Sequence, residues 1–156
     1  MQITELGHIV LYVRDITQSS GFYRAVLGWR QILPAEGQPE LMPLPHAAFN
    51  APSGRTHHEL LLIEAGPGAA APPQGNRIGL YHFGLKIGTT DDELREALAR
   101  LRDSGATIFG TSDHGVSRSL YTADPDGNEI ELYIDVPGVD WNDPAAISSP
   151  AKPLHL

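Results

Sequence analysis

Two histidines and one glutamate lie on stretches typical of β-strands and together could bind a metal ion. His8 begins the stretch HIVLYV, and His82 lies in LYHFGLKI, 82 − 8 = 74 residues further on. Glu131 lies in EIELYID. Two imidazoles and one carboxylate leave coordination positions open on an octahedral metal, as in non-haem Fe(II) sites that bind both a substrate and oxygen. This ligand set favours Fe(II) and is also compatible with Mn(II).

A second group of side chains could transfer protons. The stretch THHELLLI carries His57, His58 and Glu59 in succession. Because neighbours on a strand point to opposite faces, His58 and Glu59 cannot both face a metal, and neither can His57 and His58. If His58 faces the metal, the site has three ligands and a base. If Glu59 faces it, the site has two histidines and two glutamates.

The elements that must position these residues follow one order twice: strand, helix and three strands. Apolar spacing predicts a helix from Asp15 to a Gly28 cap, and a capping box of Thr90 and Glu93 predicts a second helix that ends at Gly105. Strands are expected over 8–13, 57–65, 80–87, 106–110, 117–123 and 129–135, with two weak strands within 29–50.

Each half is too small to bury a sheet face alone, so the pattern predicts an α+β fold. Two βαβββ modules would form one curved mixed sheet around a central metal cavity, with the helices outside. We expect a single domain over residues 1–136, with modules at about 1–65 and 79–136 and a Pro/Gly/Ala linker at 66–78. Residues 137–156 form a C-terminal extension without periodicity, expected to lie on the surface.

Composition excludes several classes of function. The net charge is −8 with no cluster of Lys or Arg, which argues against a nucleic-acid partner. The absence of Cys excludes disulfides, thiolate metal sites and cysteine nucleophiles. No stretch approaches the roughly 20 apolar residues of a membrane span, and the first residues do not resemble a signal peptide. We therefore expect a cytoplasmic protein with no membrane partner.

Four stretches carry a resemblance to a known family: LGHIVLYV, THHELLLI, LYHFGLKI and, above all, DHGVSRSLYTADPDGNEIELY. Over about residues 3–135 the chain resembles the vicinal oxygen chelate superfamily (glyoxalase/bleomycin resistance/dioxygenase), whose members are built from paired βαβββ modules. Within it, the chain is most similar to the type I extradiol catechol dioxygenases. Many of those enzymes carry an additional pair of modules, whereas this chain has one pair, so its pocket would be more open or completed by a second subunit.

The resemblance implies a role for each polar residue of these stretches. The metal ligands would be His8, His82 and Glu131. The residues that act on the substrate would be His58 as the acid–base, His114 beside the substrate, and Tyr121 as a hydrogen-bond partner of the bound diol.

The expected function is that of a metal-dependent extradiol dioxygenase that cleaves a catechol-type diol with O₂. Chelation acidifies a catechol, as bound metals acidify oxygen ligands generally. A neutral histidine such as His58 could then take the second proton and later return it, which a group with a pKa near 7 does best. The partners would be a small aromatic diol and O₂, and on resemblance we expect a homo-oligomer.

Two alternatives stay open at this point. With Glu59 as a fourth ligand, the chain would resemble the glyoxalase-type isomerases and epimerases of the superfamily, which need no O₂. It could also be a non-catalytic protein that binds a small molecule, and metal content separates that reading from both enzymes.

Several other residues are expected to have no catalytic role. His46 and His155 are expected in a loop and in the tail, exposed to solvent. Phe22, Tyr23 and Trp29 are expected in the core.

Overall fold

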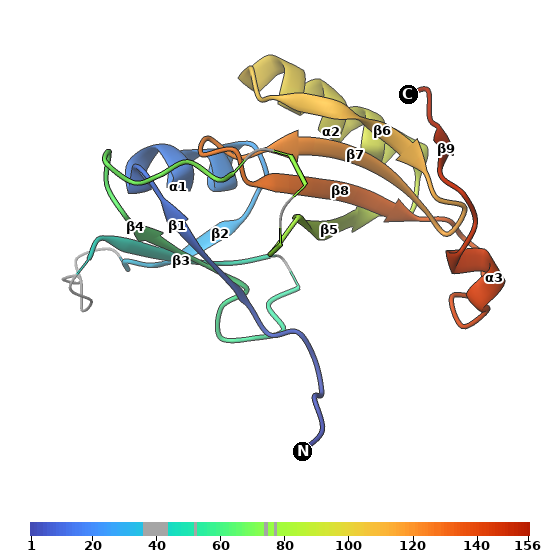
Figure 1. Cartoon of the computed structure of the whole chain (residues 1–156), viewed down its shortest axis with the longest axis horizontal. Coiled ribbons are helices and arrows are strands. Elements are labelled where there is room, and N and C mark those ends of the chain that lie inside the picture. The colour runs from blue at the N-terminus through green and yellow to red at the C-terminus, as the bar shows by residue number, and fades with distance from the viewer. Residues whose placement is uncertain (36–43, 52, 74, 77) are drawn as a thin grey trace. The chain divides into compact units, whose positions relative to one another are not determined.

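The computed structural model describes residues 1–35, 44–51, 53–73, 75–76 and 78–156. The chain divides into two compact units, Met1–Ala71 and Pro72–Leu156, and each is described by itself. The first contains β1 (Ile9–Val13), α1 (Ile16–Ala25), β2 (Arg30–Leu33), β3 (His46–Asn50) and β4 (Leu60–Glu64). The second contains β5 (His82–Gly88), α2 (Asp91–Ser104), β6 (Ile108–Asp113), β7 (Ser117–Ala123), β8 (Glu129–Asp135), α3 (Pro144–Ile147) and β9 (Lys152–Pro153) (Figure 1).

The predicted α+β class, with the βαβββ order repeated, is confirmed. The strand order is β1-β4-β3-β2 in the first unit and β5-β8-β7-β6-β9 in the second. In each unit the first strand pairs in parallel with the fourth, and the remaining strands of the module pair antiparallel. The described strands therefore hydrogen-bond as two sheets, where the sequence predicted one, because each module's first strand finds its partner within its own module.

The first unit buries one face of its sheet beneath α1. Asp15 caps this helix by accepting a hydrogen bond from the Gln18 backbone N–H at 2.9 Å. The ring of Tyr23 is fully buried, 6.2 Å from the ring of Phe49 on β3. Leu60 and Leu62 of β4 are buried as well. Phe22 and Tyr23 thus lie in the core, as expected.

The second unit separates its two faces by strict alternation along β8. Ile130, Leu132 and Ile134 are buried, and α2 packs against β5, β7 and β8 through Leu94, Leu98 and Leu101 (Figure 1). Because side chains alternate across a strand, Glu129, Glu131, Tyr133 and Asp135 point to the opposite face. One face of this sheet therefore holds the aliphatic core, and the other presents polar groups.

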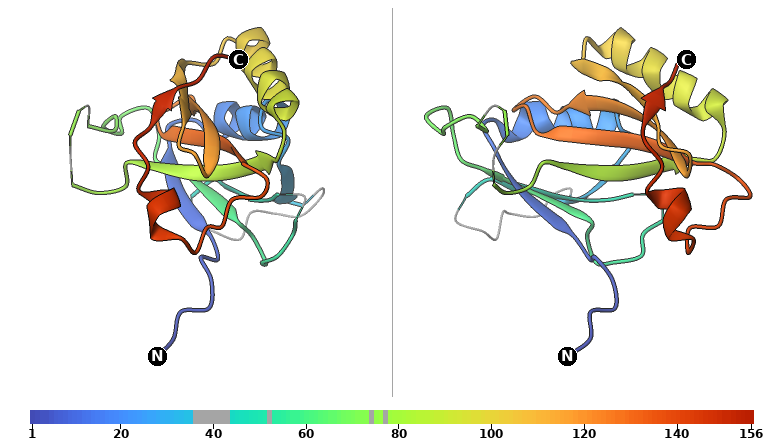
Figure 2. Two further views of the ribbon diagram at one scale, coloured as in Figure 1. Left: turned by 90° about the vertical axis from the view of Figure 1, so that its right-hand side faces the viewer. Right: turned by 45° about the vertical axis from the view of Figure 1, so that its right-hand side comes forward.

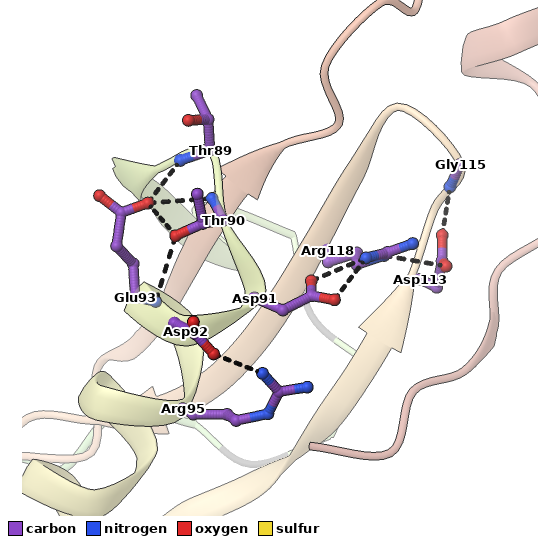
Figure 3. Close-up of polar contacts among 9 residues, drawn as sticks. All are labelled: Thr89, Thr90, Asp91, Asp92, Glu93, Arg95, Asp113, Gly115 and Arg118. Atoms are coloured by element: carbon purple, nitrogen blue, oxygen red, sulfur yellow. Dashed lines mark hydrogen bonds and ion pairs between the residues drawn. The ribbon is translucent and has the colours of Figure 1, made fainter.

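The predicted capping box is present at the start of α2. Thr90 Oγ1 accepts a hydrogen bond from the Glu93 backbone N–H at 3.4 Å, and Glu93 Oε2 accepts from the backbone N–H groups of Thr89 and Thr90 (Figure 3). Gly88 makes room for this arrangement, since a Cβ at that position would overlap the Glu93 carboxylate. The glycine before the helix is therefore part of the cap.

Arg118 on β7 ties the first turn of α2 to the end of β6. Its Nη1 donates to both carboxylate oxygens of Asp91 at 2.7 Å, and its Nε donates to Asp113 at 3.3 Å (Figure 3). The hydrogen bond from the Gly115 backbone and the neighbouring Arg118 lower the pKa of Asp113. Carboxylates from two elements thus fix one guanidinium, next to the β6–β7 turn.

The C-terminal extension forms more structure than its sequence indicated. It contains the short helix α3 and then pairs through β9 with the end of β6, Ser112 opposite Pro153 and Asp113 opposite Lys152 (Figure 2). Thr111 Oγ1 adds a hydrogen bond to the carbonyl of Leu154 at 2.7 Å. Within the described ranges, no helix is long and apolar enough to cross a membrane.

We predict that Thr90→Ala destabilises the protein by about 1 kcal/mol, the usual cost of removing a helix N-cap side chain. The reason is that the variant loses the hydroxyl that both accepts from and donates to Glu93. Urea denaturation would measure the free energy of unfolding. Thr89→Ala is the matched control, because Thr89 contributes its backbone N–H to this cap. Equal losses in the two variants would contradict a capping role for the Thr90 side chain.

We also predict that the stability advantage of the wild type over Glu93→Gln depends on pH. The Thr90 side chain and the Thr89 and Thr90 backbones donate to the Glu93 carboxylate and lower its pKa. A lowered pKa in the folded state stabilises the fold above the ordinary glutamate value of about 4.3, and this contribution disappears as the pH falls through the folded-state pKa. Thermal unfolding between pH 7 and pH 3 checks this, and a constant difference across that range would contradict it.

Candidate functional site

A tight turn sets the register between β7 and β8. The buried Asp124 carboxylate accepts hydrogen bonds from the backbone N–H groups of Asp126 and Asn128 at 3.0 and 2.9 Å. Gly127 has a φ of 89°, a conformation that residues with a side chain rarely adopt. The resulting register places Tyr121 directly opposite Glu131. The DPDG turn therefore determines which β7 side chains lie beside Glu131.

His82 and Glu131 meet on the polar face of the second unit. The parallel register of β5 and β8 pairs Gly84 with Glu131 and His82 with Glu129. His82 Nε2 lies 3.2 Å from Glu131 Oε2. A Cβ on Gly84 would lie 3.3 Å from the Tyr133 ring, a tight contact, and 3.5 Å from that oxygen, an ordinary one. The structure thus brings together two of the three predicted ligands.

A chain of hydrogen bonds extends from Glu131. Its Oε1 accepts from Ser119 Oγ at 2.5 Å and from the Tyr121 hydroxyl at 3.2 Å, and His114 Nε2 lies 2.9 Å from the same hydroxyl. Burial, the charge of Glu131 and the hydrogen bond to it raise the pKa of Tyr121 to about 12. Tyr121 therefore stays protonated near neutral pH and can donate a hydrogen bond.

The donor atoms of His82 and Glu131 fit a metal ion. Two ligand atoms at about 2.1 Å from one octahedral metal, at a right angle to each other, lie about 3 Å apart, close to the 3.2 Å between His82 Nε2 and Glu131 Oε2. The other ring nitrogen of His82, Nδ1, is buried and has no hydrogen-bond partner among the described residues. Glu129 Oε1 lies 3.7 Å from this Nδ1. An imidazole that binds a metal through Nε2 carries a proton on Nδ1 and would donate it to such a carboxylate.

Three imidazoles gather in the first unit. The ring centroid of His58 lies 4.6 Å from that of His8, and that of His57 lies 5.7 Å from it. The Nδ1 atoms of His57 and His58 are 2.6 Å apart, so one of them donates a hydrogen bond to the other. Burial, followed by the charges of His57 and His8, lowers the pKa of His58. The lowered pKa favours the neutral form of the His58 imidazole.

The expectation that His57 and His58 face opposite ways is wrong. It rested on a strand over 57–65, but β4 begins only at Leu60. His57 and His58 precede the strand, so side-chain alternation does not apply to them, and both rings lie near His8. The choice between His58 and Glu59 therefore has to be argued from their contacts rather than from side-chain alternation along the strand.

Glu59 is bound to the loop between β3 and β4. Its Oε2 accepts a hydrogen bond from the Ala51 backbone N–H at 2.7 Å, and its Oε1 accepts from Ser53 Oγ at 3.0 Å. Its backbone also joins the sheet, since the Glu59 N–H donates to the Phe49 carbonyl and the Glu59 carbonyl accepts from Ile9. Both carboxylate oxygens thus hold the loop in place, whereas the His58 ring lies against His8.

His46, which was expected in a solvated loop, is the buried first residue of β3, with 5% of its surface exposed. Its Nδ1 lies 3.2 Å from the Leu44 carbonyl oxygen. The prolines around it indicated a loop, but its pairing with Ile63 draws it into the sheet. His155 is exposed in the tail, as expected, and Trp29 is only partly buried.

The six predicted site residues fall into two groups. His8 and His58 lie together in the first unit, and His82, Glu131, Tyr121 and His114 lie together in the second. No cluster of three or more His, Asp or Glu side chains with metal-binding geometry occurs in the part of the chain that the structure describes. That His8 completes the ligand set of His82 and Glu131 therefore stays a prediction.

Two residues that contact this site were missed from the sequence. Ser119 donates to Glu131, and Glu129 Oε1 lies 3.7 Å from His82 Nδ1. A signal for each was present, since Ser119 is two residues before Tyr121 and Glu129 is two residues before Glu131. Residues two apart on a strand share a face.

Comparison with known proteins identifies the family of this chain. Residues 5–132 match the model of the Glyoxalase/Bleomycin resistance protein/Dioxygenase superfamily. A catechol-2,3-dioxygenase of Bacillus subtilis is 38% identical over 138 residues, which cover 88% of this chain and 44% of that protein. A biphenyl-2,3-diol 1,2-dioxygenase of Rhodococcus globerulus is 30% identical over 137 residues, which cover 83% of this chain and 63% of that protein. The chain thus spans less than two thirds of the length of either relative.

The fold comparison agrees as well. A glyoxalase/bleomycin resistance protein/dioxygenase domain from Frankia superposes with a TM-score of 0.70 at 22% identity, covering 88% of this chain and 96% of that one. A match that extends over most of the chain in sequence and in fold assigns the family. The chain belongs to the glyoxalase/bleomycin resistance protein/dioxygenase superfamily.

Proposed function

We propose that this chain is a metal-dependent extradiol dioxygenase that cleaves the ring of a catechol-type aromatic diol with O₂. The superfamily includes dioxygenases as well as glyoxalases and resistance proteins, so membership alone does not choose among them. The dioxygenases of Bacillus subtilis and Rhodococcus globerulus support the choice, because they are similar to this chain over more than four fifths of its length.

One observation carries the proposal: the continuous contact from His82 through Glu131 and Tyr121 to His114. The three separations are 3.2, 3.2 and 2.9 Å. It joins a pair of metal-ligand side chains to a phenol and an imidazole that can bind a substrate oxygen. Binding of an apolar ligand alone would not require these hydrogen-bonded polar groups, so they favour an enzyme over a non-catalytic binding protein.

The metal would be Fe(II), with Mn(II) as the other suitable ion, and its ligands would be His8, His82 and Glu131. When bound, it supplies Lewis acidity that lowers the pKa of the diol hydroxyl groups. Glu131 would bind through Oε2, since Oε1 accepts from Ser119 and Tyr121. Two imidazoles and one carboxylate would leave coordination positions open for a substrate with two adjacent oxygens.

Proton transfer would fall to His58, and substrate orientation to Tyr121 and His114. A neutral His58 would accept a proton from the diol and return it later in the reaction, acting first as a base and then as an acid. Because the pKa of Tyr121 is about 12, its hydroxyl stays protonated near neutral pH and would donate a hydrogen bond to a substrate oxygen. His114 Nε2, beside that hydroxyl, would hold it in place.

The glyoxalase-type alternative requires Glu59 as a fourth ligand. Both of its carboxylate oxygens accept hydrogen bonds from the loop at Ala51 and Ser53, and releasing them would leave the Ala51 N–H without its acceptor. These contacts favour His58 as the residue that serves the site. We further propose that the enzyme acts in the cytoplasm as a homo-oligomer.

Oxygen uptake tests the proposed reaction directly. Protein loaded anaerobically with Fe(II) would be mixed with a panel of catechols while oxygen consumption and the yellow ring-cleavage product are recorded together. We expect one O₂ consumed for each product molecule. Bound iron without oxygen uptake across the panel would contradict the proposal and favour an isomerase that uses Glu59. Protein that binds no metal would favour a non-catalytic binding protein.

We predict that His58→Phe retains bound iron but loses ring cleavage by about 10²–10⁴-fold in kcat, the usual contribution of a general acid–base. The phenyl ring keeps the contact with His8 but cannot accept a proton. Iron content and single-turnover product formation would be measured side by side. His155→Phe, in the exposed tail, is the matched control. An unchanged kcat in His58→Phe would remove this residue from the mechanism.

A further inference from the structure

We propose that Ser119 and Glu129 are positioning residues that hold the two ligand side chains of the second unit ready for the metal. Ser119 would fix Glu131, and Glu129 would fix His82. The inference rests on the proposed function, because it takes these two side chains as metal ligands. It adds two residues to the site and predicts that metal affinity depends on both.

Ser119 is fully buried and makes the shortest contact to Glu131. Its Oγ lies 2.5 Å from Glu131 Oε1, which is typical of a hydroxyl that donates to an ionised carboxylate. Such charge-assisted bonds are roughly twice as strong as those between neutral groups. β7 places Ser119 on the same face as Tyr121, and both donate to the same oxygen.

The two oxygens of the Glu131 carboxylate therefore have different partners. With two donors on Oε1, Oε2 is the oxygen left for a metal, and it is also the one that lies 3.2 Å from His82 Nε2. The carboxylate is thereby held so that it binds through one oxygen. Losing the Ser119 hydroxyl would free the group to rotate and to turn both oxygens towards solvent or metal.

Glu129 occupies the corresponding place on the other side of the His82 ring. It lies directly opposite His82 in the parallel register, and its Oε1 is 3.7 Å from Nδ1. That nitrogen is buried and has no hydrogen-bond partner among the described residues. This distance between Nδ1 and Oε1 is about 1 Å longer than a hydrogen bond, and a small rotation of the Glu129 side chain would shorten it to hydrogen-bond length.

The imidazole of His82 therefore lies between two carboxylates of β8. Glu131 is next to Nε2 and Glu129 is next to Nδ1. A proton on Nδ1 that donates to Glu129 fixes the tautomer, so that Nε2 is free to bind a metal. The same contact makes the ring a stronger ligand, and removing such a partner typically weakens metal binding 10- to 100-fold.

Metal binding by the 156-residue chain tests this inference without relying on turnover. Mn(II) would be titrated into the metal-free protein while the EPR signal of free Mn(II) is followed, which gives a Kd for each variant. We expect Ser119→Ala and Glu129→Gln each to bind Mn(II) about 10- to 100-fold more weakly than the wild type. Ser119→Thr, which keeps a hydroxyl, should recover most of the loss.

Matched controls separate positioning from a general loss of structure. Ser117→Ala changes the same residue type on the same face of β7, opposite Asp135 rather than beside the ligand pair. Glu96→Gln removes one negative charge from the exposed surface of α2. Both controls should bind Mn(II) within about twofold of the wild type, and the melting temperatures of the metal-free variants should agree.

The outcomes distinguish this inference from the proposed function. Wild-type affinity in Ser119→Ala or in Glu129→Gln would remove that residue from the site, and wild-type affinity in both would overturn the inference. A wild-type chain that binds no Mn(II) would overturn it as well, together with the metal-dependent function. Weakened binding in the two variants, beside a wild type that takes up no oxygen, would support the inference and contradict only the dioxygenase.

Discussion

The pairing of β7 with β8 is the constraint on which the candidate site depends. Its register is set at one end by the hydrogen bonds that Asp124 accepts within the turn. From there, alternation directs Ile130, Leu132 and Ile134 towards α2 and places Glu131 on the opposite face, across from Tyr121. Burying the aliphatic side chains and arranging the polar ones are consequences of the same ladder, so the core stabilises the geometry of the site.

The polar face of the second unit combines groups that would be costly to bury alone. Ser119 and Tyr121 both donate hydrogen bonds to the Glu131 carboxylate, and burial together with the charge of that carboxylate raises the pKa of Tyr121. Each of these polar side chains forms a hydrogen bond with its neighbour on the same face of the sheet, as expected for a network in a medium of low polarity. In the first unit, burial and the neighbouring imidazoles lower the pKa of His58.

Much of this could be predicted from the sequence, where the signals are local. The capping box at Thr90 and the alternation in EIELYID depend on neighbours within a few residues, and both are present in the structure. The contacts of Ser119 depend on pairing between strands, which local patterns do not fix. The strand expected from His57 begins only at Leu60, and the buried position of His46 follows from its pairing with Ile63.

The glycine-containing turn between β7 and β8 also has a consequence for how this family can diverge. Adding or deleting one residue between Asp124 and Asn128 would shift the ladder by one position. Ile130 would then lie on the polar face, and Glu131 would be driven into the aliphatic layer under α2. Substitutions can therefore accumulate around this hairpin, but changes in its length are excluded for as long as the glutamate is used.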